Sequence, residues 1–288
     1  MPANVARTGG NLSNGNFLPA VWSKLINSKY YAQTCLMNIA NSKWEGEIKG
    51  QGSQVEIRVR PTILVNDYTA NSAIQYQDLV DEKITLLLDK AKSFAFKVDD
   101  VDKVQSDINV MDEVTTDAGF QMKIAIEKMV FSTIYSDATN TIAQIALDKT
   151  NVIDWMVDSE VVLEENNMPA EDRWIIVPPK VAGLIQKSDL KNAAITGDDT
   201  SVLRKNLNNG RLGTIAGYTI YVSNNLTKTN GVYQCIAGHK SALTFASQLV
   251  KTETVRLQDR FADSVRGLNV YGYKTVLPQG LVYMPCTA

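Results

Sequence analysis

The chain contains one histidine, His239, and any Ser-His-Asp or Cys-His hydrolase would have to use it. His239 follows an apolar run and a glycine, and Cys235 lies just before it in the same run. No G-x-S-x-G sequence is present to supply a serine nucleophile. A lone histidine without such a motif is usually structural, so a hydrolase that pairs His239 with Cys235 or a carboxylate is retained only as a minor alternative.

Two groups of carboxylates could bind a metal or transfer protons. Asp99, Asp100 and Asp102 lack the glycine and distal glutamate of a calcium loop, so a solvated acidic turn before a helix is favoured. The second group has helical spacing and comprises Asp154, Asp158, Glu160, Glu164 and Glu165. Paired carboxylates do acid–base chemistry only in a cleft, and the solvated face of an amphipathic helix accounts for this group more simply.

Glycines and cysteines add no cofactor signal. Gly210, Gly213 and Gly217 precede a predicted strand, whereas a phosphate loop links a strand to a helix. The chain has three cysteines and no C-x-x-C pair, so neither a disulfide framework nor a zinc site is indicated. We expect reduced, buried thiols, and no metal or cofactor.

Composition is that of an ordinary folded protein. The 288 residues are 44% apolar and 21% charged, with a formal net charge of −2. That balance argues against a protein that grips phosphate backbones through a basic face. No run of 18 apolar residues is present, so no membrane span is expected, and the polar N-terminus lacks the apolar core of a signal peptide.

The feature that stands out is a pair of alternating segments, 54–60 and 83–98. In the first, Val55, Ile57 and Val59 alternate with polar residues, which predicts a strand with one covered face. The residues between the two segments are too many for a tight hairpin and too polar for a core. An isolated ribbon is marginally stable, so we expect this two-stranded arm to rest on another subunit.

The other elements predict an α+β fold. An apolar stripe that starts at Met111 predicts one long helix over 109–136, interrupted only by Gly119. Further helices are expected within 17–42, over 150–166 and 180–190, and from 240–248. Strands are expected over 173–179, 214–226 and 232–239 and in the tail, with a long loop over 191–214. The character of the chain changes near residues 145 and 247.

Taken in order, several segments resemble the major capsid proteins of tailed bacteriophages, the family with the Hong Kong 97-like fold. The resemblance covers nearly the whole chain. Its strings are FLPAVWSKLINSKYYAQ (17–33), WEGEIKGQGSQVEIRVRP (44–61), DKAKSFAFKVDDVDKVQSD (89–107), RWIIVPP (173–179), GTIAGYTIYVSNNL (213–226) and RFADSVRGLNVYGYKTVLP (260–278). No string is diagnostic alone, and the specificity lies in their order and spacing.

The resemblance implies a division of the chain into parts with set roles. Residues 1–43 would be an N-terminal arm, and 44–100 an extended loop forming the β-ribbon. Residues 101–139 would hold the spine helix and part of a peripheral domain. The block 140–247 would be an axial domain, and 248–288 would return strands to the peripheral domain.

The same resemblance implies a structural protein and no enzyme. Copies would assemble through hexamers and pentamers into an icosahedral shell that encloses double-stranded DNA without reading its sequence. The shell would form in the host cytoplasm and belong to the virion, with a portal and, because little precedes residue 17, a separate scaffolding protein. A nanocompartment shell that encloses a cargo enzyme shares the fold and is the alternative.

Aromatic residues and arginines anchor contacts between proteins, and such residues gather in the expected arms. We therefore expect subunit contacts at Trp22 in the N-terminal arm and at Arg58, Arg60, Tyr68 and Tyr76 along the ribbon.

Overall fold

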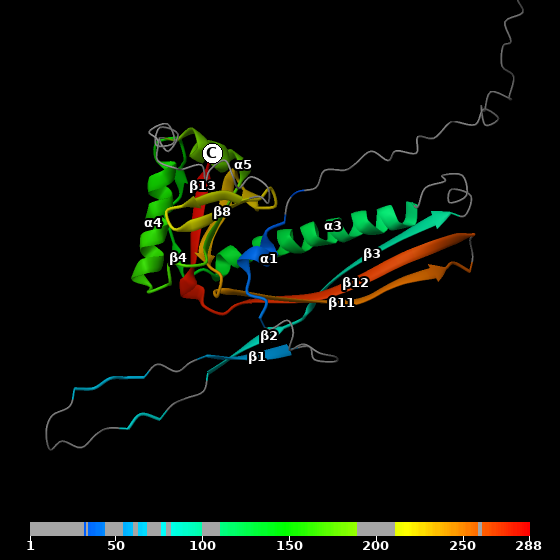
Figure 1. Cartoon of the computed structure of the whole chain (residues 1–288), viewed down its shortest axis with the longest axis horizontal. Coiled ribbons are helices and arrows are strands. Elements are labelled where there is room, and N and C mark those ends of the chain that lie inside the picture. Colours follow the sequence, from blue (N-terminus) through cyan, green and yellow to red (C-terminus); the bar gives the residue numbers. More distant parts are fainter. Residues whose placement is uncertain are drawn as a thin grey trace, which may run out of the picture.

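The computed structural model describes residues 32, 34–43, 54–59, 63–67, 76–78, 82–99, 110–188, 211–258 and 261–288. The predicted α+β class is confirmed. Over these residues the strands form an eight-stranded, a three-stranded and a two-stranded sheet. Figure 1 shows a globular part built on the first sheet, an elongated part built on the second, and an arm formed by the third.

The globular part is a mixed sheet covered by helices. Its strands run in the order β4 (Asn140–Thr141), β13 (Leu281–Thr287), β10 (Val232–His239), β6 (Arg173–Val177), β8 (Tyr218–Val222) and β7 (Arg211–Ile215), with β5 (Ile145–Ala146) on β13 and β9 (Lys228–Thr229) on β10. All five residues of β6 are buried, which accounts for the continuous run RWIIV of a central strand. The predicted strands at 173–179 and 232–239 are confirmed.

Two helices pack against this sheet, and they lie where the sequence predicted helices, over 150–166 and 180–190. They are α4 (Val152–Glu165) and α5 (Pro179–Lys187), the latter with proline in its first turn. The buried face of α4 carries Trp155, Met156 and Leu163, whereas Val157 and Val161 are exposed. These two apolar side chains therefore lie on the outward side of α4.

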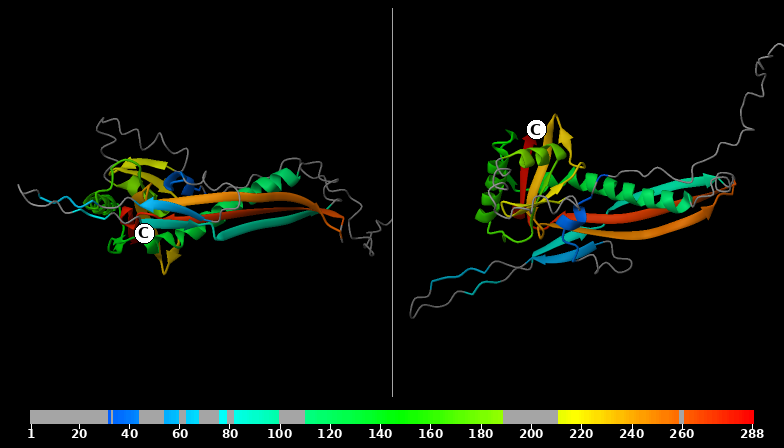
Figure 2. Two further views of the ribbon diagram at one scale, coloured as in Figure 1. Left: turned by 90° about the horizontal axis from the view of Figure 1, so that it is seen from below. Right: turned by 45° about the horizontal axis from the view of Figure 1, so that its top comes forward.

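The elongated part consists of a long helix and a long hairpin. The helix α3 (Val110–Phe131) has 22 residues and is therefore about 33 Å long. It ends five residues earlier than the predicted 109–136, and a 3₁₀ turn, η3 (Ile134–Asp137), follows. Beside α3 lie β11 (Leu243–Arg256), β12 (Ala262–Thr275) and β3 (Lys90–Asp99), in the antiparallel order β11-β12-β3 (Figure 2).

One expectation for the C-terminal third was wrong. A helix was expected to begin within 240–248, but β11 begins at Leu243 and pairs with β12 from Leu243 opposite Thr275. Pairing across the sheet overrides the weak helical preference of these residues. At the end of the chain, β13 leaves the hairpin and pairs with β10 in the eight-stranded sheet.

The arm is shorter than its sequence pattern indicated. Strand β1 (Gln54–Val59) pairs antiparallel with β2 (Glu82–Leu87). The chain then passes through Leu88 and Asp89 into β3, which pairs with β12. The single alternating segment 83–98 is therefore two strands in two different sheets. Of the helix expected within 17–42, the structure shows α1 (Leu36–Ile39) and no helix over 40–42, whereas residues 17–31 lie outside the described residues.

One apolar core joins the globular part to the root of the elongated part. Its largest fully buried side chains include Trp155 of α4, Tyr218 of β8, Tyr271 of β12 and Phe131 of α3. Residues from both sheets and from α3 share this cluster, so the two parts cannot separate without exposing it to water.

Candidate functional site

The base of the arm packs on its own subunit. Val55 and Ile57 of β1, with Leu86 and Leu88, form a buried cluster that Ala246 of β11 completes. Ile84, Val270 and Val276 pack around this cluster. The period-two alternation correctly predicted a covered face. The expectation that another subunit covers this face was wrong for the base, because β11 and β12 of the same chain cover it.

A glycine permits this close contact. Where the chain passes from β2 to β3, the backbone of Leu87 and Leu88 crosses directly over Gly272 of β12. A Cβ atom at Gly272 would collide with the carbonyl oxygen of Leu87, which is backbone and cannot rotate away. Gly272 is thus the position at which the base of the arm packs directly on the hairpin.

Gly272→Ala is expected to unseat the base of the arm and to destabilise the subunit by about 1–3 kcal/mol, the usual range for overpacking. Amide hydrogen exchange should quicken at Leu86 and stay slow at Ile236 in the main core. Gly183→Ala in α5 is the matched control, because nothing lies within 4 Å of a Cβ atom there. Equal exchange at Leu86 in both variants would contradict the seating role of Gly272.

The outer part of the arm carries exposed apolar side chains. Ile63, Leu64 and Val65 are 69%, 68% and 94% exposed, and Tyr76 on the opposite limb is 92% exposed. The amide of Leu64 donates a hydrogen bond to Oε1 of Gln77 at 2.9 Å, which joins the two limbs. Both described segments lie beyond β1 and β2, on the side away from the far end of α3 (Figure 1).

The predicted contact residues fall partly on this arm. Arg58 of β1 and Tyr76 are exposed, and Arg58 lies opposite Lys83 in the ribbon. Trp22, Arg60 and Tyr68 lie outside the described residues. Sequence reasoning missed Ile63, Leu64 and Val65, because the loop taken as a whole is polar. The signal was the unbroken apolar run ILV shortly after Pro61.

The opposite end of the subunit has a second exposed apolar group. Phe261, directly before β12, is 81% exposed. The hairpin behind it is braced by cross-strand ion pairs, Arg266 with Glu253 at 2.6 Å and Arg256 with Asp263 at 3.2 Å. Such exposed, isolated aromatic side chains at the end of a braced hairpin are typical of contact points between proteins.

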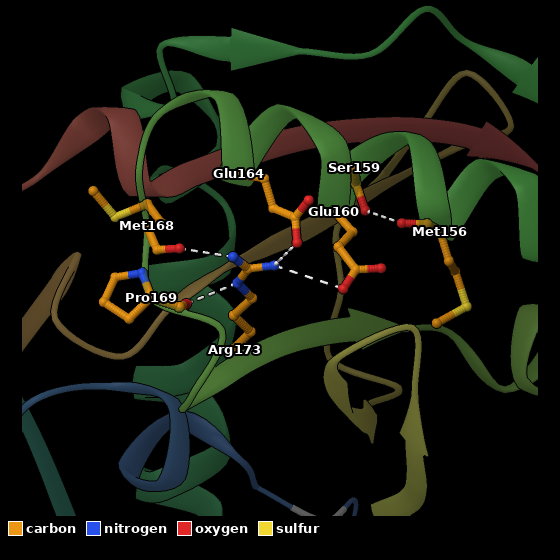
Figure 3. A network of polar contacts seen from close by, with 7 residues as sticks. All are labelled: Met156, Ser159, Glu160, Glu164, Met168, Pro169 and Arg173. Carbon is orange, nitrogen blue, oxygen red and sulfur yellow. Dashed lines mark hydrogen bonds and ion pairs between the residues drawn. The ribbon is translucent and has the colours of Figure 1, made fainter.

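In the globular part, a buried arginine contacts both α4 and the loop that follows it (Figure 3). Arg173 of β6 donates through Nε to the carbonyl of Pro169 at 2.8 Å and through Nη2 to that of Met168 at 2.7 Å. Its Nη1 lies 3.7 Å from Glu160 and 3.6 Å from Glu164, both on α4. Two carboxylates assigned to the solvated face of α4 therefore hold a guanidinium at the end of β6.

This arrangement ties the end of α4 to the central strand. The side chain of Arg173 is 2% exposed, so its charge has lost almost all of its water. The carboxylates supply compensating charge, and the carbonyls of the loop after α4 supply hydrogen bonds. Nearby, burial raises the pKa of Tyr218 to about 12, so its phenol stays protonated. Glu160 and Glu164 are thus engaged in holding Arg173.

His239 and the cysteines do not form a catalytic pair. The Nδ1 atom of His239 lies 2.7 Å from Oγ of Ser241 and accepts a hydrogen bond from the backbone N–H of Ser241 at 3.2 Å. Burial lowers the pKa of the imidazole. Cys235 is four positions away on the same strand, about 13 Å at 3.3 Å per residue. Burial raises its pKa well above the usual value, and its sulfur lies 3.5 Å from that of Cys286.

The expectation of buried, reduced thiols is confirmed, since Cys35, Cys235 and Cys286 are all free and buried. Over the described residues, no group of three His, Cys, Asp or Glu side chains is arranged to hold a metal ion. No helix in that part of the chain is long and apolar enough to cross a membrane.

An arm, a long helix beside a long hairpin, and a globular domain together define a capsid subunit of the Hong Kong 97-like fold. A structure from Mycobacterium phage Che8 matches with 30% identity and a TM-score of 0.76, over 93% of this chain and 97% of that one. The capsid of cyanophage P-SCSP1u matches with 13% identity and a TM-score of 0.70, over 94% of each chain. The capsid of an empty GTA particle matches with 12% identity and a TM-score of 0.69, over the full length of both chains.

The family model described as phage capsid protein matches residues 82–284. The chain belongs to this family, and it is a structural capsid protein. No curated protein matches the chain. Neither the nanocompartment shell nor the hydrolase is favoured by these findings.

Proposed function

We propose that this protein assembles with copies of itself, through hexamers and pentamers, into the icosahedral shell that encloses the double-stranded DNA of a tailed phage. The observation that carries the proposal is the apolar trio Ile63, Leu64 and Val65, which is exposed on the outer part of the arm. The apolar face at the base of the arm, by contrast, is already buried against its own subunit. Exposed apolar side chains so far from the subunit's own core need a partner, and in a shell the partner is a second copy.

The two ends of the subunit suit repeated, weak contacts. The arm reaches out on one side and Phe261 ends the hairpin on the other, so each copy can engage more than one neighbour. Many small contacts add through multivalency, and each can stay weak enough to be corrected during assembly. A formal net charge of −2 keeps repulsion between crowded copies small.

Roles for the parts of the chain follow from this proposal. Residues 1–43 and 44–100 provide the arms, and β3 anchors the second arm in the three-stranded sheet. Residues 101–139 and the hairpin strands within 248–288 contribute to a peripheral domain, and 140–247, joined by β13, forms the axial domain around the symmetry axes. Contacts with neighbouring copies include Trp22, Arg58, Arg60, Tyr68 and Tyr76. The shell assembles in the host cytoplasm with a portal and a separate scaffolding protein, and it does not read the DNA sequence.

We further propose that the protein is not an enzyme. His239→Ala is expected to leave assembly unchanged and to cost about 1 kcal/mol of stability, because one hydrogen-bonded pair with Ser241 is lost. Thermal unfolding and electron microscopy measure the two effects. Hydrolysis of a panel of esters or peptides by the purified protein, abolished by His239→Ala, would contradict the proposal.

The decisive test of the proposed function is electron microscopy of the purified protein after size-exclusion chromatography, expressed alone and with its neighbouring genes. Closed shells, or rings of six and five copies, are the expected result. A uniform monomer or dimer under every condition would overturn the proposal. Neighbouring portal and terminase genes are expected for a phage, whereas a neighbouring cargo enzyme would support a nanocompartment.

A further inference from the structure

A buried carboxylate stands where three separate segments of the chain meet. Glu127 of α3 is fully buried. Its Oε2 atom accepts hydrogen bonds from the backbone amides of Cys35 at 2.6 Å and Leu36 at 3.0 Å. Its Oε1 atom accepts from Oγ of Ser223 at 3.0 Å and from Nδ2 of Asn225 at 2.9 Å. A carboxylate offers about four lone-pair positions, and here all of them are used.

The first pair of donors belongs to a short segment, residues 35–41, which we call the strap. The strap contains α1, whose Leu36 and Ile39 are buried in the main core. At its far end, the amide of Asn41 donates to the carbonyl of Leu243 at 2.8 Å, and the amide of Phe245 donates to the carbonyl of Asn41 at 3.2 Å. The strap therefore runs from the long helix to the start of β11.

The second pair of donors belongs to the globular part. Ser223 and Asn225 directly follow β8, and the amide of Ser223 donates to the carbonyl of Val177 in β6 at 3.1 Å. Glu127 consequently contacts the elongated part through its own helix, the globular part through Ser223 and Asn225, and the strap through Cys35 and Leu36.

Hydrogen bonds can fix an orientation that apolar packing leaves adjustable. The shared core holds the two parts together, but apolar contact is non-directional and permits small rotations. Hydrogen bonds weaken steeply when their angles change, and those made by a charged acceptor are the strong ones. Four such bonds converging on one carboxylate define one mutual orientation of α3, the strap and the eight-stranded sheet.

We propose that Glu127 is a positioning residue for assembly, which holds the globular part, the strap and the long helix at the single mutual orientation in which copies fit together. Without it the subunit keeps its sheets and the part of the core between them, but the strap, with Leu36 and Ile39, loosens from that core. The globular part and the long helix then no longer hold their contact surfaces at the relative orientation that assembly needs. The role of Glu127 in assembly rests on the proposed function, whereas its role in fixing the orientation of the two parts within one subunit does not.

The chemistry of the site separates the role of the acceptor from the role of the charge. In Glu127→Gln, the amide nitrogen can face Ser223 and Asn225, because a hydroxyl can rotate to accept and an asparagine amide can flip its oxygen inward. The remaining oxygen still accepts from the amides of Cys35 and Leu36, which cannot change their role. Glu127→Gln is therefore expected to keep the strap in place, whereas Glu127→Leu leaves all four donors unpaired.

A further variant separates the two sides of the joint. Ser223→Ala combined with Asn225→Leu removes only the donors of the globular part. The amides of Cys35 and Leu36 keep their acceptor in this double variant. The strap should remain bound to α3, while the tie to the eight-stranded sheet is lost.

The test is hydrogen exchange on the isolated subunit, with maleimide labelling located by mass spectrometry. We expect Glu127→Leu to quicken exchange at Leu36 and labelling at Cys35 at least about tenfold, as loss of a charge-assisted hydrogen bond implies. Exchange at Ile175 and Ile236 in the sheet should match the wild-type protein. Glu127→Gln and the Ser223–Asn225 double variant should keep Leu36 protected.

Assembly of the same variants is then followed by electron microscopy. Glu127→Leu and the double variant should lose closed shells, and Glu127→Gln should retain them. Hydrogen exchange that quickens equally at Leu36 and Ile236 would show a general loss of stability and would overturn the proposal. A Glu127→Leu variant in which Leu36 stays protected, or which forms normal shells, would also overturn it. If even the wild-type protein forms no shells, the proposed function fails, and the exchange pattern still decides the role of Glu127 within the subunit.

Discussion

Arg173→Ala is expected to destabilise the subunit by about 3–5 kcal/mol, the cost of breaking a buried ion pair by removing one partner. The carbonyls of Met168 and Pro169 lose their donors, and Glu160 loses its compensating charge. Equilibrium unfolding in urea measures the change in the free energy of unfolding. Since stability of a domain is commonly about 5–15 kcal/mol, this one substitution should remove a large share of it.

Two further variants identify which contacts of Arg173 matter. Arg173→Lys keeps the charge but cannot reproduce the forked donation to two carbonyls, so it should recover only part of the loss. Glu164→Gln should cost about 0–1 kcal/mol, because the side chain of Glu164 is 59% exposed and its ion pair is screened by water. If Arg173→Ala cost no more than Glu164→Gln, the network would not be what ties α4 to β6.

Replacing Ile63, Leu64 and Val65 together by serine is expected to abolish assembly and to leave the folded subunit intact. These side chains are more than two-thirds exposed, so their loss should change the free energy of unfolding by no more than about 0.5 kcal/mol each. In a shell they would be buried against a neighbour in every copy, and the loss repeats at each contact. Size-exclusion chromatography and electron microscopy detect the loss of shells, and thermal unfolding detects any damage to the subunit.

Asp67→Asn in the same segment is the matched control, and it should assemble normally. Two further variants, deletion of residues 66–76 and Arg58→Glu, should impair assembly as the triple serine variant does, without unfolding the subunit. Normal shells from the triple serine variant would remove the principal support for the arm as an assembly contact. A subunit that unfolds would instead mean that the trio packs on its own chain.

Local patterns in the sequence predicted much of the fold. The apolar spacing that begins at Met111 predicted α3, because residues three and four positions apart lie on one face of a helix. The run RWIIV predicted a buried strand, and alternation at Val55 and Ile57 predicted which face of the arm is covered. The order of several weak strings predicted the family, which no single string could have done.

Contacts between distant segments were beyond the reach of these patterns. A helix was expected near Leu243, because the residues there have no strong preference of their own and only pairing with β12 makes them a strand. Glu127 lies near the C-terminal end of α3, and a glutamate on a helix ordinarily faces water. Its four donors come from residues more than 90 positions away. No spacing rule connects such residues.

The sequence by itself determined the class of fold, the main helices and strands, the family and the absence of a recognisable catalytic motif, since these depend on periodicity, composition and the order of segments. Only the tertiary structure decided what covers the base of the arm, which sheet receives β13, and why Glu127 and Arg173 are buried. The physical reason is that a buried charge is stable only where donors or opposite charges converge on it, and that convergence exists only once the chain has folded.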